Sequence, residues 1–291
     1  MSATPIKFTK MSAGGNDFIV IDNITTAPDS VEPDPGQIRR MCARALSVGA
    51  DGVILIGPPD AGGTVRMVYH NSDGGRADLC GNGVRCVARF SALKRIAPPE
   101  SIVIETDVGP LRAGVESDRA FFTLPLGAPR IEPRTLELPG SLDEVSRQVE
   151  AFHVTVGVPH LVVPIRDAHG MPGRELLSLA PRLRRHPDLG PEGANIDFIT
   201  VRDRHTLDIR CYERGVEAET LSSGSGCIAS ALAARAAGLA DSPIACRSRT
   251  GLVSQVRLED GAAGTEATLS GDARVIYTGV LHDEALTGFD A

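Results

Sequence analysis

Two glycine-containing turns, each followed directly by a helix-forming run, constrain the fold of this chain more than any other feature. The first turn is Gly81-Asn82-Gly83, preceded by Cys80, and the second is Gly224-Ser225-Gly226, preceded by Ser223. The two turns lie 143 residues apart, about half of the 291-residue chain. Repetition at half the chain length predicts two homologous lobes, each with a strand that ends in a glycine-containing helix start.

Each of these turns has the backbone features of an anion site. Glycine lets the backbone turn tightly, and the first N–H groups of a helix have no partner within the helix. Such a helix start attracts anions and lowers the pKa of a neighbouring thiol. We therefore expect a substrate carboxylate to lie between the two helix starts and Cys80 to supply a thiolate base.

The pattern of apolar residues predicts an α+β fold. Many short strand-like runs, with about one long helix per lobe, are not typical of a doubly wound α/β sheet. Each long helix should lie inside or against its own strongly curved, mixed or antiparallel sheet. Shorter helices are expected at residues 37–46 and 176–185. Residues 127–139, which carry three prolines, are predicted to cross between the lobes.

The lobes predicted from this pattern are nearly equal in length. The first covers residues 1–128 and is completed by a C-terminal strand at about 274–291, and the second covers residues 129–273. We expect the active site in the cleft between them.

The composition argues against several kinds of partner and site. A net charge of −7 with dispersed Lys and Arg leaves no basic patch, so no nucleic-acid partner is expected. No apolar run has the length of a signal peptide or a membrane span, so no membrane association is expected. The six cysteines are scattered without a C-x-x-C pair. We therefore expect neither a metal site nor a disulfide framework, and predict a reducing, cytoplasmic location.

Five motifs occur in a recognisable order along nearly the whole chain. They are Gly15-Asn16-Asp17-Phe18, Leu79-Cys80-Gly81-Asn82-Gly83-Val84-Arg85-Cys86, Gly157-x-Pro159-His160, Asn195-Ile-Asp-Phe198, and Glu213-Arg214-Gly215-Val216 with Glu219-Thr220-Leu221. Each alone is weak, but together they closely resemble the diaminopimelate epimerase family. The resemblance implies two pseudo-symmetric lobes with a central helix in each, a homodimer and no cofactor. It also implies a small amino-acid substrate, since this family interconverts L,L- and meso-diaminopimelate on the way to lysine and peptidoglycan precursors.

The chemistry of such an epimerase explains why two thiols are needed. An amino-acid α-proton is a very weak acid, and without pyridoxal phosphate there is no electron sink. One thiolate must abstract the proton while a thiol on the opposite face returns another. Preorganised N–H groups in a closed, dry cleft must hold the carboxylate. By resemblance, Cys80 is one of the bases, and His160 and Glu213 tune the cysteine bases.

The resemblance also assigns the residues that bind the substrate. The two helix starts, Gly81-Asn82 and Gly224-Ser225, match the positions that hold the α-carboxylate and α-amino region. The positions that match holders of the other polar groups, including the distal amino-acid end, are Asn16, Asn71, Asn195, Glu213 and Arg214.

Three positions depart from the family pattern. Ser223 stands where the family has its second catalytic cysteine, and a hydroxyl is expected to be a poor direct base, although it could relay a proton through water. Neither Cys227, one helical turn further on, nor Cys86 is expected to replace it, because both are predicted to be core residues. Val158 stands where many members carry a substrate-binding Asn, and Gly52 where some carry Gln. These two changes loosen the assignment of the substrate.

Four interpretations stay open on this sequence. The first is a diaminopimelate epimerase in which Ser223 is either natural or an introduced Cys→Ser change. The others are a racemase of another amino acid, a one-base dehydratase of the hydroxyproline type, and a non-catalytic amino-acid-binding paralogue. Glu213-Arg214 and the asparagines fit an acyclic, doubly zwitterionic substrate better than a proline ring. Exchange of the α-proton would separate the enzymes from the binding protein.

Overall fold

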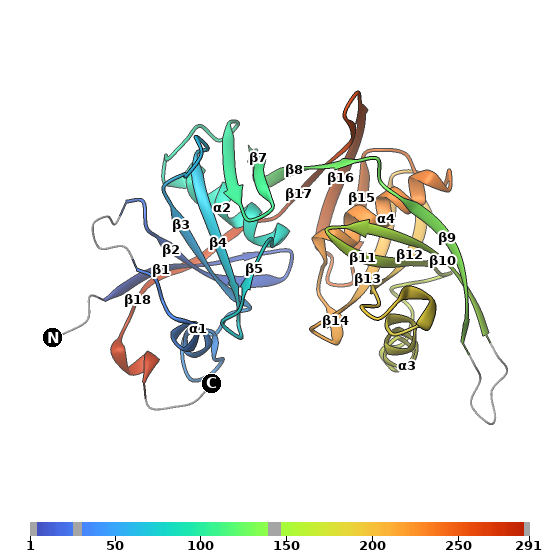
Figure 1. Ribbon diagram of the computed structural model, residues 1–291, viewed down its shortest axis with the longest axis horizontal. Coiled ribbons are helices and arrows are strands. Elements are labelled where there is room, and N and C mark those ends of the chain that lie inside the picture. The colour runs from blue at the N-terminus through green and yellow to red at the C-terminus, as the bar shows by residue number, and fades with distance from the viewer. Residues whose placement is uncertain (1–4, 26–30, 139–146, 288–291) are drawn as a thin grey trace. The chain divides into compact units, whose positions relative to one another are not determined.

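The computed structural model describes residues 5–25, 31–138 and 147–287, and its contacts divide the chain into two compact units. Unit 1 comprises Met1–Thr123 and Ser270–Ala291, and unit 2 comprises Leu124–Leu269. The chain leaves unit 1 within strand β8 (Arg119–Gly127) and returns to it within strand β17 (Gly264–Gly271), as the colours of Figure 1 show.

Unit 1 is a mixed sheet curved around helix α2 (Gly81–Leu93). Its strands lie in the order β18, β1, β2, β3, β4, β6, β7 and β8, with the short β5 also beside β4. The β2–β3 and β4–β6 pairs are parallel, and the other pairs are antiparallel. The bounds of its other elements are β1 Ile6–Ala13, β2 Asn16–Asp22, α1 Pro35–Cys42, β3 Gly52–Gly57, β4 Val65–Asn71, β5 Arg76–Ala77, β6 Ile102–Thr106, β7 Gly109–Glu116, β18 Arg274–Leu281 and the 3-10 turn Asp283–Leu286.

Unit 2 repeats this plan around helix α4 (Gly224–Ala236). Its strands lie in the order β9, β10, β11, β12, β13, β15 and β16, with the short β14 also beside β13. The parallel pairs are β11–β12 and β13–β15. The bounds of its other elements are β9 Ile131–Leu138, β10 Arg147–Val156, β11 Val158–Pro164, α3 Gly173–Arg184, the 3-10 turn Pro187–Leu189, β12 Asn195–Asp203, β13 Thr206–Glu213, β14 Ala218–Thr220, β15 Ile244–Ser248 and β16 Val253–Gly261.

The two units match element for element, which gives each residue of one unit a counterpart in the other. Strands β2, β3 and β4 with helix α2 correspond to β11, β12 and β13 with helix α4. The helices α1 and α3 follow the first of these strands in their units. This repetition makes the fold α+β with two pseudo-symmetric lobes, as the repeat of the glycine-containing turns predicts.

Helix α4 forms the centre of unit 2 because its sequence is apolar on most sides, and α2, although it carries Arg85 and Arg89, buries most of its residues in unit 1. Helix α2 contacts β1, β4, β6 and β7, and α4 contacts β9 to β13, β15 and β16 (Figure 1). In α4 the run from Cys227 to Ala234 is buried throughout, and its alanines favour a helix. A helix that is apolar on most sides is stable only inside a protein core. The core therefore fixes where each helix starts.

Several local predictions from the sequence are wrong. Residues 127–139 do not form a simple crossing, since they contain β9 up to Leu138, and Pro139 lies outside the described residues. Helix α1 ends at Cys42 rather than at residue 46. The strands β5, β14, β15 and β17 were not predicted. No helix in the described ranges is long and apolar enough to cross a membrane.

Candidate active site

The start of α2 places the Cys80 thiol at the positive end of the helix. Cys80 is the N-cap residue in an extended conformation, and its Sγ accepts the N–H of Gly83 at 3.4 Å. The first turn of the helix contains no acidic side chain, so no carboxylate of its own neutralises this end. Gly81 lies against the Phe122 ring, 3.0 Å from where a Cβ would stand. The geometry leaves this helix start suited to an anion beside a half-buried thiol.

An amide network connects this helix start to the loop before β2. The Nδ2 of Asn82 donates to the Oδ1 of Asn16 at 2.5 Å, and the Nδ2 of Asn16 donates to Asp51 at 3.1 Å. The buried Arg85 donates to the Oδ1 of Asn82 at 2.8 Å. Gly14 has a positive φ, and a Cβ there would overlap the side chains of Arg85 and Asn82. Two predicted substrate-binding residues, Asn16 and Asn82, are thus held in fixed orientations.

Tyr69 is a neighbour of Cys80 that the sequence analysis missed. Its hydroxyl hydrogen-bonds to Cys80, and burial, followed by the charge of Cys80, raises the pKa of Tyr69 far above its usual value. The ring packs edge-on against Phe18, with 6.0 Å between ring centroids. It also lies over Gly52, where a Cβ would stand 2.6 Å from Tyr69 Cε2. The glycine at position 52 therefore makes the room that Tyr69 occupies.

Asn71 ends β4 at the rim of unit 1. It lies opposite Gly52 across the β3–β4 pair, and its backbone N–H donates to the carbonyl oxygen of Gly75 at 2.8 Å. The side chain is exposed. The predicted unit 1 residues, Asn16, Asn71, Cys80, Gly81 and Asn82, therefore gather around the start of α2 and the adjoining strand ends.

The start of α4 has the same geometry with a hydroxyl in place of the thiol. Ser223 is the N-cap residue, and its Oγ accepts the N–H of Gly226 at 3.2 Å. The Oγ atoms of Ser223 and Ser225 are 3.4 Å apart. Ser223 also hydrogen-bonds to Glu213, whose Oε1 accepts the hydroxyl of Thr220 at 3.0 Å. Burial raises the pKa of Glu213 despite these hydrogen bonds.

His160 lies in the interior of unit 2 and is paired with Asp197, a residue of the Asn195-Ile-Asp-Phe198 motif to which the sequence assigned no role. The Nδ1 of His160 is 2.7 Å from the Oδ2 of Asp197, and both side chains are fully buried. His160 lies on β11 opposite Asn195 of β12. Asn195 in turn accepts the backbone N–H of Arg214 at 2.8 Å, and the guanidinium of Arg214 pairs with Glu192 at 2.7 Å.

The predicted site residues thus form two groups, one in each unit. Those of unit 2 gather around the start of α4 and the ends of the strands beside it, and comprise His160, Asn195, Glu213, Arg214, Ser223, Gly224 and Ser225. Cys86 and Cys227 are buried, as their predicted core positions require. Within the described residues, no group of His, Cys, Asp and Glu side chains has the arrangement of a metal site.

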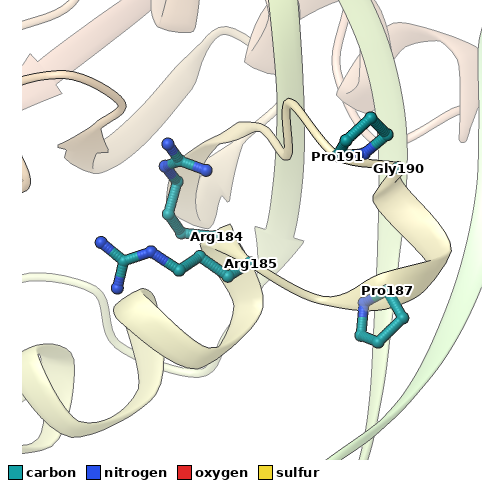
Figure 2. Close-up of a pocket in the computed structure, with 5 residues that line it drawn as sticks. All are labelled: Arg184, Arg185, Pro187, Gly190 and Pro191. Carbon is teal, nitrogen blue, oxygen red and sulfur yellow. The ribbon is translucent and has the colours of Figure 1, made fainter.

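The hollow drawn in Figure 2 lies in unit 2, beside the end of α3. It has a volume of about 490 Å³ and is lined by Arg184, Arg185, Pro187, Gly190 and Pro191, none of which is a predicted site residue. The two arginines extend from the end of α3, and both pair with Glu217, at 3.0 and 2.9 Å. Glu217 thus engages both guanidinium groups and neutralises one of their two charges, and no predicted site residue lines the hollow, so it is a weak candidate for the site.

The arrangement of the two helix starts defines what the chain can do chemically. Each offers unpartnered backbone N–H groups to an anion. One carries a thiol that can remove a proton, and the other carries a hydroxyl next to a carboxyl of raised pKa. These are the elements of proton transfer next to a carboxylate.

Comparison with solved structures identifies the class of fold. A phenazine biosynthesis protein of the PhzF family from Bacillus anthracis superposes with a TM-score of 0.70 at 14% identity, covering 96% of this chain and 99% of the other. A hydroxyproline epimerase from Agrobacterium vitis superposes with a TM-score of 0.68 at 16% identity, covering 97% and 94%. At these identities the likeness shows the fold alone, which this chain shares with the PhzF protein and the hydroxyproline epimerase.

Comparison of sequences identifies the family. The profile described as diaminopimelate epimerase matches residues 8–131 and 152–276. A diaminopimelate epimerase from Gemmatimonas aurantiaca is 35% identical over 288 residues, which is 95% of this chain and 99% of the relative. One from Aquifex aeolicus is 32% identical over 289 residues, covering 97% and 99%. The chain belongs to the diaminopimelate epimerase family and is an isomerase.

Proposed function

We propose that this protein interconverts L,L- and meso-diaminopimelate without a cofactor, as a step towards lysine and peptidoglycan precursors. The observation that carries the proposal is the pair of equivalent helix starts, N-capped by Cys80 and Ser223, in a chain of this family. The relatives that it matches over nearly their whole length are diaminopimelate epimerases.

In this proposal Cys80 is the thiolate that removes the α-proton. The N–H of Gly83 and the hydroxyl of Tyr69 both point at its sulfur and support a negative charge there. The substrate carboxylate binds the two helix starts, because negative charge develops on it as the proton leaves. The proposal therefore needs both starts to meet one substrate, as expected for a cleft between the lobes.

The remaining polar residues are assigned to binding the substrate. Asn16 and Asn82 are oriented by their shared network, and Asn195 by its hydrogen bond from the N–H of Arg214. Asn71 is exposed at a strand end, where a side chain can reach a ligand. Amide and guanidinium groups suit the carboxylate and ammonium groups at both ends of diaminopimelate.

Ser223 decides how fast the reaction runs. It stands at the position of the second catalytic cysteine, and we propose that it passes a proton through water rather than acting as a base itself. We assign Glu213 to this relay, because it hydrogen-bonds to Ser223 and burial raises its pKa above the usual value. Epimerisation is therefore expected to be slow compared with a two-thiol site.

The deciding experiment is incubation with L,L-diaminopimelate in D2O, following α-deuterium and stereochemistry together. Deuterium that enters with inversion is the result expected of an epimerase. Exchange with retention would mean that Cys80 works alone. Absence of exchange despite binding would overturn the proposal in favour of an amino-acid-binding protein, and exchange with another amino acid alone would change the substrate.

Two variants make that experiment specific to the proposed base. Cys80→Ala should abolish α-deuterium incorporation, because the sulfur at the start of α2 is lost. Cys86→Ala, in the same helix but buried, should retain it. Exchange that persists in Cys80→Ala would show that another group is the base.

We further propose that the protein is a cytoplasmic homodimer. Strand β18 exposes Val275, Ile276, Tyr277 and Val280, a larger apolar group than an edge strand of a monomer usually leaves uncovered. All six cysteines are free thiols, which suits a reducing compartment. Light scattering after size exclusion should give a dimer mass, and Ile276→Glu should give the monomer. A monomeric wild-type protein at micromolar concentration would contradict the dimer.

A further inference from the structure

The His160–Asp197 pair leaves two polar atoms without partners in the interior of unit 2. The Nδ1 of His160 contacts the Oδ2 of Asp197 at 2.7 Å. Neither the Nε2 of His160 nor the Oδ1 of Asp197 has a hydrogen-bond partner among the described residues. Both side chains are completely buried. Buried polar atoms without partners are costly, so their presence calls for a reason.

The counterparts of this pair in unit 1 are apolar. Phe18 lies opposite Gly52 across β2–β3 as His160 lies opposite Asn195 across β11–β12. A Cβ on Gly83 of α2 would meet Ile54, and one on the equivalent Gly226 of α4 would meet Asp197. The pair in unit 1 is therefore Phe18 and Ile54, and both of these side chains are also fully buried.

The comparison of the two units shows whether the fold itself requires a polar pair at these positions. The same strands and the same helix start are built in unit 1 with two apolar side chains, so the fold does not require a histidine and an aspartate there. Replacing a buried ion pair by apolar groups of similar volume is often neutral or stabilising. A polar pair that the fold does not need points to a chemical role.

We propose that Asp197 is a positioning residue that holds His160 as the tautomer with the proton on Nδ1. The inference rests on the proposed function, in which His160 tunes a cysteine base. With Nδ1–H donated to the Oδ2 of Asp197, the lone pair of Nε2 is the one that faces outward from the pair. Nε2 then takes the proton from the catalytic thiol, which leaves a thiolate and an imidazolium. Once the thiolate has taken the α-proton, the imidazolium releases its own proton to water, which balances the proton delivered to the substrate by way of Ser223. The carboxylate of Asp197 neutralises the imidazolium while it exists.

The described titratable groups around the pair carry no positive charge that would compete with His160 for the carboxylate of Asp197. Burial, followed by the charge of Asp197 and a side-chain hydrogen bond to it, holds the pKa of Cys211 well above its usual value, so Cys211 remains a neutral thiol beside this carboxylate. A hydrogen bond to Cys227, together with burial, does the same for Cys246. Burial lowers the pKa of His153, which keeps that ring uncharged at neutral pH. Glu213 is the other acid near the pair, and burial raises its pKa.

The first test reads the tautomer directly in the wild-type protein. Nitrogen-15 NMR of the histidine rings, assigned with His160→Gln, distinguishes a protonated Nδ1 from a protonated Nε2 by their chemical shifts. The Nδ1–H form is expected for His160 at neutral pH. The Nε2–H form would overturn the proposal. The tautomer can be read whether or not the protein is active. A wrong tautomer assignment can therefore be distinguished from a wrong proposed function, which the D2O experiment tests.

The second test uses the unit 1 pair as the design for a variant. The double variant His160→Phe/Asp197→Ile should fold with a melting temperature equal to or above that of the wild type and show no α-proton exchange. Asp197→Asn should lower kcat for exchange by at least ~100-fold with little change in KM, because the tautomer is no longer fixed. Exchange at the wild-type rate in either variant would overturn the proposal. If neither variant folds, the wild-type tautomer decides.

Discussion

At the scale of single residues, Ser223 is where this site differs most from a pair of thiol bases. A helix start contributes about 0.3–2 kcal/mol to the stability of an anion, and one pKa unit corresponds to about 1.4 kcal/mol. That contribution brings a thiol of pKa about 8.5 towards neutrality but leaves a hydroxyl far from ionised. The hydrogen bonds of Ser223 to Glu213 and to the N–H of Gly226 orient the hydroxyl without making it a base.

A thiol at this position should supply a second base. Ser223→Cys is expected to raise the rate of epimerisation by ~10²–10⁴-fold, the usual contribution of a positioned acid or base. The measurement is the appearance of the inverted isomer in D2O. Ser222→Cys is the matched control, since it places a thiol one residue earlier, and it should leave the rate unchanged. An unchanged rate in Ser223→Cys would mean that this side chain does not face the substrate.

Tyr69 provides a second prediction at this scale, because it donates to the sulfur of Cys80. Tyr69→Phe keeps the ring against Phe18 and removes only the hydroxyl. A hydrogen bond to a charged group contributes about 1.5–3 kcal/mol, so the pH at which Cys80 is half alkylated should rise by roughly one unit or more. Alkylation by iodoacetamide, read on the Cys80 peptide by mass spectrometry, measures it.

The control for that prediction is another buried tyrosine. The hydroxyl of Tyr212 donates to the carbonyl oxygen of Glu217 at 2.8 Å, in the other unit. Tyr212→Phe should leave the alkylation profile of Cys80 unchanged. A profile that is the same in Tyr69→Phe and in the wild type would show that Cys80 does not depend on Tyr69.

Sequence reasoning finds residues in glycine-containing motifs far better than residues inside strands. Cys80 and Ser223 could be predicted as N-caps because glycine and a short polar residue mark a helix start locally. Asp197 and Tyr69 lie within ordinary core strands, and their partners are distant in sequence. Only the folded chain brings Asp197 to His160 and Tyr69 to Cys80. The one local signal was the glycine at position 52, which is needed to make room for Tyr69.

At the scale of elements, the two helix starts differ in how tightly they are packed. A Cβ on Gly226 would overlap the Oδ1 of the buried Asp197, which cannot move far. A Cβ on the equivalent Gly83 would stand 2.8 Å from the flexible end of Met67 and 3.1 Å from Ile54 Cδ1. Overpacking against a fixed carboxylate costs more than overpacking against a side chain that can rotate.

Alanine at the two positions should therefore have unequal effects. Gly226→Ala is expected to lower the free energy of unfolding by roughly 2–3 kcal/mol, and Gly83→Ala by about 1 kcal/mol. Gly173→Ala, at the start of α3, has no heavy atom within 4 Å of the new Cβ and should be neutral or slightly stabilising. Urea titration of the three variants measures this order. If Gly226→Ala and Gly83→Ala lower the free energy of unfolding equally, the contact with Asp197 does not make the start of α4 the more tightly packed of the two.

The strands that sequence analysis missed share a cause. In β9, Pro133 removes one backbone donor, and within the described residues β10 is the strand that pairs along it. In β17, buried and partly exposed positions alternate, but Leu269 is the one large apolar side chain on the buried face. Such segments carry weak local signals and are strands because their neighbours pair with them. The repeat of the topology would have predicted β15 and β17 once the first unit was known.

At the scale of the whole molecule, an internal repeat has been adapted at a few positions. The strand order, the parallel pairs and the N-capped helix starts are common to both units. The two units differ at the residues that are predicted to form the active site. The thiol, its tyrosine donor and the asparagine network belong to unit 1, while the histidine–aspartate pair and the buried glutamate belong to unit 2. The repeat predicts the fold, and the positions at which it is broken indicate the site.

The ionic network beside the site makes the stability of the molecule depend on pH. Asp17 lies next to the predicted binding residue Asn16, and it pairs with Lys10 at 2.7 Å and Arg44 at 2.6 Å. Burial opposes ionisation of Asp17, but the hydrogen bonds from Arg44 and Lys10 prevail and lower its pKa to about 2. The hydrogen bond from Arg76 is the main reason that the pKa of Asp107 is also about 2.

Because both pKa values are lowered on folding, these carboxylates stabilise the folded chain at neutral pH and lose that contribution on acidification. The contribution is complete above about pH 5 and is lost as the pH falls through about 2, and for Asp17 it amounts to about 2 kcal/mol. Urea titrations from pH 7 to pH 2.5 should show the free energy of unfolding falling below pH 4. Asp17→Asn should be less stable than the wild type at pH 7 and approach it in acid. If the difference in unfolding free energy between the two proteins stays constant over that range, the hydrogen bonds from Arg44 and Lys10 do not lower the pKa of Asp17.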